Sequence, residues 1–230
     1  AGTGCGVISA NGCAVADGTA YWMGNNGFYS YNGSVQSMRS SVGDFIFSHL
    51  NTTERSKVFA VVNSQFSEVV WFYPSAGTTE NDSYVSYNYR ENHWQIGKVA
   101  RTAGFDIGAF VFPNYTSADG YVYEHEVGNA YDTDSDVFAE TGPMQIGVGD
   151  RMMVATSLIP DEQTQGDVTA TFKTRTYPNS AESSFGPFDM ANPTSVRFQG
   201  RQVQMRVTGD QPTSWRVGNM RLEVVAGSRR

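Results

Sequence analysis

The sequence predicts an all-β protein built from propeller-like blades, each a short meander of antiparallel strands. Hydrophobic residues make up 40% of the chain and charged residues only 17%, and the 24 glycines favour strands and turns over solvated helices. Asn-Gly and Asp-Gly pairs recur between short runs of aromatic and β-branched residues. A chain of 230 residues is long enough to bury a sizeable core in one or two such domains.

The first blade is predicted over Cys13 to Met38. Within it, Tyr21 to Gly33 reads YWMGNNGFYSYNG, where Asn25-Asn26-Gly27 interrupts two aromatic runs. Asn and Gly tolerate the positive φ angles of the turns that match strand twist. Asp17-Gly18 supplies a similar turn upstream, so the segment can fold as four short strands in sequence order.

A second blade is predicted over Lys57 to Val99, after a short helix or turn in Val42 to Arg55. This second segment holds four period-two or continuously apolar runs separated by polar turns: KVFAVVN, EVVWFYPS, SYVSYNYR and HWQIGKV. Large aromatic side chains fill the space between twisted sheets. Trp71 and Trp94 are therefore expected in the packing between blades.

Two further strands are predicted between Phe105 and Gly128, FDIGAFVFPNY and GYVYEHEVG, with Ser117 to Gly120 as their turn. Pro113 lies inside the first of these runs. Because proline cannot donate a hydrogen bond to a neighbouring strand, it predicts an edge position or a bulge.

Longer strands are predicted from Pro143 onward: MQIGVG, RMMVATSLI, DVTATFKTRTYP, TSVRFQGRQVQMRVTG and WRVGNMRLEVVAG. The stretch from Pro178 to Pro193 is rich in Ser, Pro and Asn and is expected to be a connection. The chain therefore divides into a propeller-like region, 1–142, and a C-terminal β region, 143–230. The pattern leaves open whether this second region completes the same propeller or forms a packed β-sandwich.

The acidic loop around Asp132, Asp134 and Asp136 has the spacing that begins a calcium loop. Val137 then stands where the invariant glycine belongs, and Pro143 replaces the bidentate glutamate. The loop is therefore interpreted as a solvated acidic segment, with a looser calcium site as the alternative.

Glu124-His125-Glu126 would place His125 on the opposite face of a regular strand from both carboxylates, so the three cannot share one metal ion. His49 and His93 are distant in sequence, and His93 beside Trp94 suits a packing or rim role. The chain also lacks a nucleophile elbow, a zinc-protease helix motif and a phosphate-binding loop. The sequence thus predicts no catalytic, cofactor-binding or metal-binding residues, and no enzymatic activity.

The net charge of −7 gives no overall positive field that would draw the chain onto nucleic acid. Arginines do gather in the last third, where alternating strand positions favour a solvated sheet face over a binding patch. They are Arg197, Arg201, Arg206, Arg216, Arg221, Arg229 and Arg230.

Two cysteines, Cys5 and Cys13, are too few for a disulfide framework, and buried or free thiols are expected, with a small loop disulfide as the alternative. No stretch approaches the roughly 20 apolar residues that cross a bilayer, so no membrane partner is expected. The chain begins with Ala rather than Met, which indicates a processed chain, a trimmed one or part of a longer protein.

Several of these runs together resemble a known family. They are YWMGNNGFYSYNG, VGDFIFSHLN, EVVWFYPSAGTTENDSYVSYNYRENHWQIG and the ending GRQVQMRVTG…WRVGNMRLEVVAGSRR. In this order they are similar to the packaged-DNA stabilisation and tail-hub (nozzle) proteins of short-tailed bacteriophages. The most specific parts are Trp71 to Gly97 and the arginine-bearing Gly200 to Arg221.

The resemblance implies a structural virion protein with a β-propeller fold and no enzymatic activity. It implies a homo-oligomeric ring that closes the DNA exit channel, between the portal adaptor and the distal tail proteins, through which DNA passes without sequence-specific binding. The implied location is the phage tail, with assembly in the host cytoplasm. A carbohydrate-binding or glycoside-hydrolysing propeller is the alternative, because aromatic platforms and an acidic surface also suit sugars.

Overall fold

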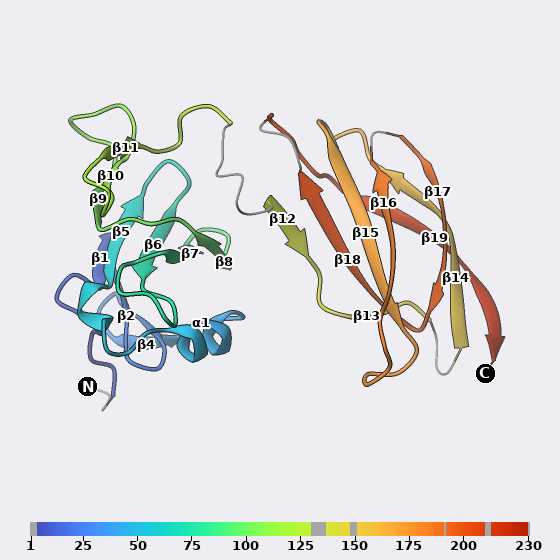
Figure 1. The fold of residues 1–230 in the computed structure, drawn as a ribbon, viewed down its shortest axis with the longest axis horizontal. Helices are drawn as coiled ribbons and strands as arrows, with labels where there is room; N and C mark the ends of the chain where they lie inside the picture. Colours follow the sequence, from blue (N-terminus) through green and yellow to red (C-terminus); the bar gives the residue numbers. More distant parts are fainter. Residues whose placement is uncertain (1–3, 130–136, 148–150, 191, 210–212, 230) are drawn as a thin grey trace. The chain divides into compact units, whose positions relative to one another are not determined.

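The computed structural model describes residues 4–129, 137–147, 151–190, 192–209 and 213–229. The chain forms two compact units, Ala1–Gly128 and Asn129–Arg230 (Figure 1). This division falls earlier than the predicted boundary after residue 142. The reason is that strand β12 (Val137–Glu140) pairs with β18 (Gln202–Gly209) of the second unit. The fold is all-β with several antiparallel sheets, as the sequence predicts.

Blade 1 is a four-stranded antiparallel meander in chain order, which confirms the strands predicted between Cys13 and Met38. Asp17 and Gly18 both have positive φ angles, 47° and 75°, as a tight turn that matches strand twist requires. The strands are β1 (Cys13–Ala16), β2 (Thr19–Met23), β3 (Phe28–Tyr31) and β4 (Val35–Met38).

A short helix follows, α1 (Gly43–His49), and then a single 3-10 turn, Arg55–Lys57. A helix of seven residues does not persist by itself in water, so α1 depends on its buried Ile46 and on Leu50 just after it. Among the described residues, no helix is long and apolar enough to cross a membrane.

Blade 2 repeats the four-stranded meander within the predicted range of Lys57 to Val99. Its second strand reads as a continuous apolar run because both of its faces are covered. The strands are β5 (Phe59–Asn63), β6 (Glu68–Tyr73), β7 (Ser83–Asn88) and β8 (His93–Lys98).

Blade 3 has three short strands, β9 (Ala103–Phe105), β10 (Asn114–Thr116) and β11 (Val122–Glu124), with β10 in the middle. The predicted long strand from Phe105 to Tyr115 was wrong. The chain leaves the sheet after Phe105 and rejoins it immediately after Pro113, which cannot donate to the ladder. The predicted turn is confirmed, with the Gly120 amide donating to the Ser117 carbonyl.

The three blades stack face to face, with blade 2 in the middle. One face of blade 2 carries Trp71 and Val85 into a core shared with Phe28 and Met23 of blade 1. Its other face carries residues such as Phe72 into a core shared with Tyr115 of blade 3. Trp94 stacks on Trp71 with ring centroids 6.2 Å apart, so both tryptophans lie between blades, as predicted.

The second unit is a β-sandwich, which settles the alternative that the sequence left open. A buried core that includes Phe172, Leu158 and Phe198 draws on strands of both sheets. One sheet has the order β12-β18-β15-β16, with β13 (Met144–Gln145) also paired to β18, and the other has the order β17-β14-β19. Their further bounds are β14 (Arg151–Pro160), β15 (Val168–Arg175), β16 (Ser183–Asp189), β17 (Thr194–Gly200) and β19 (Met220–Arg229).

Two strand predictions in this unit were wrong. The Ser, Pro and Asn-rich connection contains β16, and Pro187 is tolerated there because β16 is an edge strand. The single run predicted from Thr194 to Gly209 splits at Gly200 and Arg201, where the chain crosses from one sheet to the other.

Replacing Trp71 with alanine is expected to destabilise the first unit by about 3 to 5 kcal/mol, because a large buried aromatic leaves a cavity. Trp71 is 0% exposed, and its indole N–H donates to the Gly12 carbonyl at 3.1 Å. Urea unfolding followed by circular dichroism measures the change. Phe66→Ala, at an aromatic residue 46% exposed, is the control and should unfold like the parent. Equal midpoints for the two variants would contradict the assignment.

Candidate functional site

Ionisable side chains gather where blade 3 packs on blade 2, at what we call the blade 2–3 seam. The seam is built from one face of β5, β6 and β7 on one side and from β10 with the residues after β11 on the other. Its first part is apolar and aromatic, and its second part is polar.

The apolar part of the seam centres on Tyr115, which is 3% exposed. Its ring lies 5.4 Å from the ring of Phe72, which in turn stacks on Phe59 at 4.8 Å. On its own sheet, Tyr115 covers Gly104, its cross-strand partner, where any side chain would collide with the ring. A glycine at position 104 therefore lets this tyrosine lie flat within the seam.

The polar part of the seam holds two carboxyl groups. Glu68, at the start of β6, accepts a hydrogen bond from Gln95 Nε2 at 2.6 Å. Glu126 follows β11 and accepts a hydrogen bond from Asn63 Nδ2 at 3.1 Å. Asn63 itself is 5% exposed, and this hydrogen bond joins the ends of β5 and blade 3.

Each carboxyl group in the seam is shifted toward its protonated form. Burial raises the pKa of Glu68, and the nearby charge of Glu126 raises it further, against the opposing hydrogen bond from Gln95. Desolvation also raises the pKa of Glu126, although Glu126 keeps contact with solvent. Burial followed by the charge of Glu126 raises the pKa of Tyr115, so its phenol stays protonated.

His125 lies against the same tyrosine, with its ring centroid 4.2 Å from that of Tyr115. Arg101 Nε donates to His125 Nε2 at 2.7 Å, which fixes the neutral imidazole with its proton on Nδ1. Arg101 also lies over the Tyr123 ring at 4.2 Å. Burial, with the charge of Arg101 adding to it, lowers the pKa of His125 to about 4.

Glu124-His125-Glu126 does not form the regular strand that the sequence predicted. Strand β11 ends at Glu124, and Glu126 has a positive φ of 60°, so the alternation of faces does not continue. His125 lies on the Tyr115 face by alternation with Tyr123, and the break brings Glu126 to the surroundings of Tyr115 as well. No local pattern could have revealed the partner of Glu126, because Asn63 lies 63 residues away.

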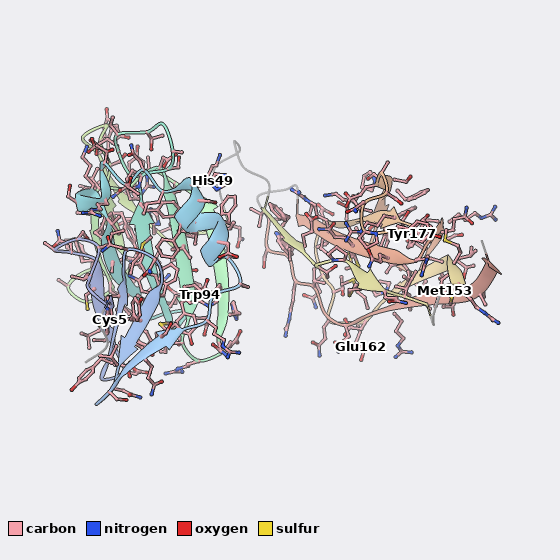
Figure 2. All side chains as sticks on the ribbon, turned by 90° about the horizontal axis from the view of Figure 1, so that it is seen from below. Cys5, His49, Trp94, Met153, Glu162 and Tyr177 are labelled. Carbon is pink, nitrogen blue, oxygen red and sulfur yellow. The ribbon has the colours of Figure 1, made fainter. Side chains whose placement is uncertain are left out.

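The other histidines lie outside the seam's hydrogen bonds. His49 is exposed on α1 and stacks on Phe45, and His93 is exposed at the start of β8, 3.4 Å from Glu91. Cys5 and Cys13 are both present as thiols. Cys5 and His49 are far apart on the first unit (Figure 2).

In the second unit, charged side chains surround Glu140 on the outer face of a sheet. Lys173 Nζ lies 3.0 Å from Glu140 Oε1, and Arg206 Nη1 lies 3.5 Å from Oε2. Arg206 also covers the Phe138 ring at 3.7 Å. Elsewhere, Arg197 is exposed between buried neighbours on β17, the alternation of a solvated face. Arg197 and Arg206 thus lie on outer sheet faces, and Arg206 is engaged by a carboxylate. Arg201 lies between β17 and β18, and Arg230 is outside the described residues.

Within the described ranges, no group of three or more His, Cys, Asp or Glu side chains is arranged to hold a metal ion. The acidic loop at Asp132, Asp134 and Asp136 lies outside the described residues, so the calcium alternative stays a prediction.

No protein-family model and no curated protein matches the chain. Among solved structures it is similar to the exo-β-1,3-galactanase of Phanerochaete chrysosporium with galactose, at 10% identity and a TM-score of 0.26, over 89% of this chain and 65% of that one. A variant of that enzyme with β-1,3-galactotriose gives 11% identity and a TM-score of 0.25, over 90% and 65%. The chain thus spans slightly less than two thirds of these enzymes, and at such scores the likeness carries no argument about fold or function.

The lowered pKa of His125 predicts how stability changes with pH. Between about pH 6.5 and about 4 the unfolded chain takes up a proton that folded His125 refuses, so this residue makes stability fall as the pH falls. Urea unfolding near neutral pH and near pH 5 should show a smaller loss for His125→Gln than for the parent. Because His125 keeps some solvent contact, the difference should stay below about 1.4 kcal/mol per pH unit. His49→Gln, on an exposed residue, is the control, and equal losses in all three proteins would contradict the assignment.

Proposed function

We propose that this chain is a structural subunit of a bacteriophage virion, a tail hub or nozzle protein. In this proposal it forms part of a homo-oligomeric ring that closes the DNA exit channel, stabilises packaged DNA and joins the portal adaptor to the distal tail proteins. In this role the chain provides a folded surface for assembly and catalyses no reaction.

One observation carries the proposal: the runs that resemble tail-hub proteins coincide with structural elements of both units. The run from Tyr21 to Gly33 extends from within β2 through β3 of blade 1, and the run from Trp71 to Gly97 extends from β6 into β8 of blade 2. The ending from Gly200 to Arg221 contains β18 and enters β19 of the sandwich. The resemblance thus extends over separately folded parts of the chain in one order, and this supports a relationship over the whole length.

The charge of the chain suits this role. A channel for DNA should not grip the phosphate backbone, and a subunit with a net charge of −7 repels phosphate over a Debye length of roughly 8 Å at physiological salt. Part of the arginine charge of the second unit is also compensated, as the pairing of Arg206 with Glu140 shows.

Deleting the gene from the source phage should give particles that lack the distal tail and lose their DNA. Electron microscopy of the particles and measurement of packaged DNA test this expectation, and supplying the intact gene from a plasmid is the control. Heads that retain DNA and carry complete tails without the protein would overturn the proposal.

A second candidate function, a glycoside-hydrolysing or carbohydrate-binding propeller, is favoured by the two carboxyl groups of the blade 2–3 seam. Retaining and inverting glycosidases use a protonated carboxyl group beside a second carboxylate. The raised pKa of Glu68 beside Glu126 is the environment that such an acid needs.

This second function predicts turnover of oligosaccharides that Glu68→Gln lowers by at least about a hundredfold, as expected for a lost general acid. Glu124→Gln is the control, because Glu124 is exposed on β11, where it pairs with Asn114 on the face away from Tyr115. Release of reducing sugar from a panel of oligosaccharides provides the measurement. Absence of turnover by the parent protein would exclude hydrolysis.

A further inference from the structure

Four side-chain oxygens of the blade 2–3 seam have no hydrogen-bond partner among the described residues. Two of them are buried: Asn63 Oδ1 and Ser86 Oγ, on residues that are 5% and 1% exposed. The other two are the Oε2 atoms of the carboxyl groups, because Gln95 donates to Oε1 of Glu68 and Asn63 donates to Oε1 of Glu126. A buried polar atom without a partner costs free energy, so these oxygens favour a ligand that satisfies them.

The four oxygens come from one face of blade 2 and from the chain that packs on it. Asn63 and Glu68 are cross-strand neighbours on β5 and β6, a pairing that holds Cβ atoms about 4.5 to 5.5 Å apart. Ser86 shares their face, because Tyr84 on the same strand packs into the seam and alternate residues of a strand point the same way. The Asn63 amide donates to Glu126 at 3.1 Å, so its own unpartnered oxygen lies near both carboxyl groups.

The two carboxyl groups are close enough to affect each other's ionisation. Burial and then the charge of Glu126 raise the pKa of Glu68, against the opposing effects of Gln95 and His93. Burial and then the charges of both carboxyl groups raise the pKa of Tyr84. Within the described ranges, no Lys or Arg forms an ion pair with Glu68 or Glu126. A bound cation would stabilise both negative charges at once.

The donor atoms of this group are all oxygens: two carboxylates, an amide carbonyl and a hydroxyl. Ca²⁺ takes about six to eight oxygen ligands of these kinds in a flexible geometry, whereas Zn²⁺ prefers nitrogen and sulfur. Glu126 is exposed, which gives water access to the remaining ligand positions. Only two of the donors are ionisable, so the group differs from the clusters of three or more His, Cys, Asp or Glu that the described residues lack.

We propose that the polar part of the blade 2–3 seam is a calcium site. The carboxylates of Glu68 and Glu126 and the carbonyl oxygen of the Asn63 amide bind the ion directly, and the Ser86 hydroxyl holds one of its water ligands. Glu126 follows β11 of blade 3, whereas the other three residues belong to blade 2. The ion therefore joins the two blades and strengthens their packing.

This inference goes beyond the proposed role in a phage tail and does not rest on it, because it concerns the purified chain alone. It competes with the second candidate function, since a bound cation keeps Glu68 ionised and prevents it from acting as a general acid. Absence of calcium binding would leave the tail proposal to be decided by the particles.

Terbium luminescence tests the site in the full chain after treatment with a chelator. Tb³⁺ replaces Ca²⁺ and emits when a nearby excited tyrosine transfers energy to it, and Tyr84 and Tyr115 lie close to both carboxyl groups. The parent should show this emission, and added Ca²⁺ should displace it. Glu68→Gln and Glu126→Gln should each raise the Kd at least about tenfold, because calcium affinity depends on the number of charged ligands.

Two further variants control for other acidic groups. Glu124→Gln removes an exposed carboxylate from β11 and should leave the Kd unchanged. Replacing Asp132, Asp134 and Asp136 together with Asn should also leave it unchanged, which separates the seam from the acidic loop. A parent that binds neither Tb³⁺ nor Ca²⁺ would overturn the proposal, as would binding that the loop variant loses and Glu68→Gln retains.

Urea unfolding with and without calcium separates ion binding from a purely structural role of the same residues. In chelator, Glu68→Gln should unfold at no lower urea concentration than the parent, since it removes one of two like charges. Weak calcium sites have Kd values of about 0.1 to 1 mM, so about 10 mM CaCl₂ should raise the midpoint of the parent and leave that of the variant unchanged. Equal shifts in the two proteins, or no shift in the parent, would overturn the proposal.

Discussion

The packing of successive β-sheets face to face is the interaction on which the rest of the first unit depends. Both faces of the inner strand β6 of blade 2 are covered, and β6 reads as an unbroken apolar run from Val69 to Tyr73 for that reason. Trp71 is fully buried between blades 1 and 2 and is tied by its indole N–H to the backbone just before blade 1. An aromatic of this size contributes both a large buried area and a directed hydrogen bond, so it fixes the distance and the register of the two sheets.

The same stacking produces the electrostatics of the blade 2–3 seam. Blade 3 is small, and its contact with blade 2 covers the aromatic part of the seam more completely than the polar part. Glu68 and Glu126 therefore lie near the buried ring of Tyr115, with Glu68 partly buried and Glu126 exposed. Partial desolvation of two like charges raises the cost of ionising both.

The two units build their buried cores from sheets of different connectivity. In the first, each sheet is a meander of consecutive strands, and only the stacking of sheets is long-range. In the second, each sheet interleaves distant strands: β14 lies between β17 and β19, and β18 lies between β12 and β15. A stack of sheets gains a new outer face with every added sheet, whereas a sandwich of two sheets buries both inner faces at once.

The sequence by itself determined the local elements of this protein. Asp17-Gly18 specified a tight turn through positive φ angles, and the period-two aromatic runs specified the strands of blades 1 and 2. Only the tertiary structure decided that the second unit forms a sandwich, because the residue pattern of one strand does not specify which other strand pairs with it. It also decided that His125 and Glu126 meet Tyr115, since β11 ends at Glu124 and the hydrogen bond from Asn63 to Glu126 spans 63 residues. Local backbone preference is encoded within a few residues, whereas burial and pairing depend on which distant surfaces the folded chain brings into contact.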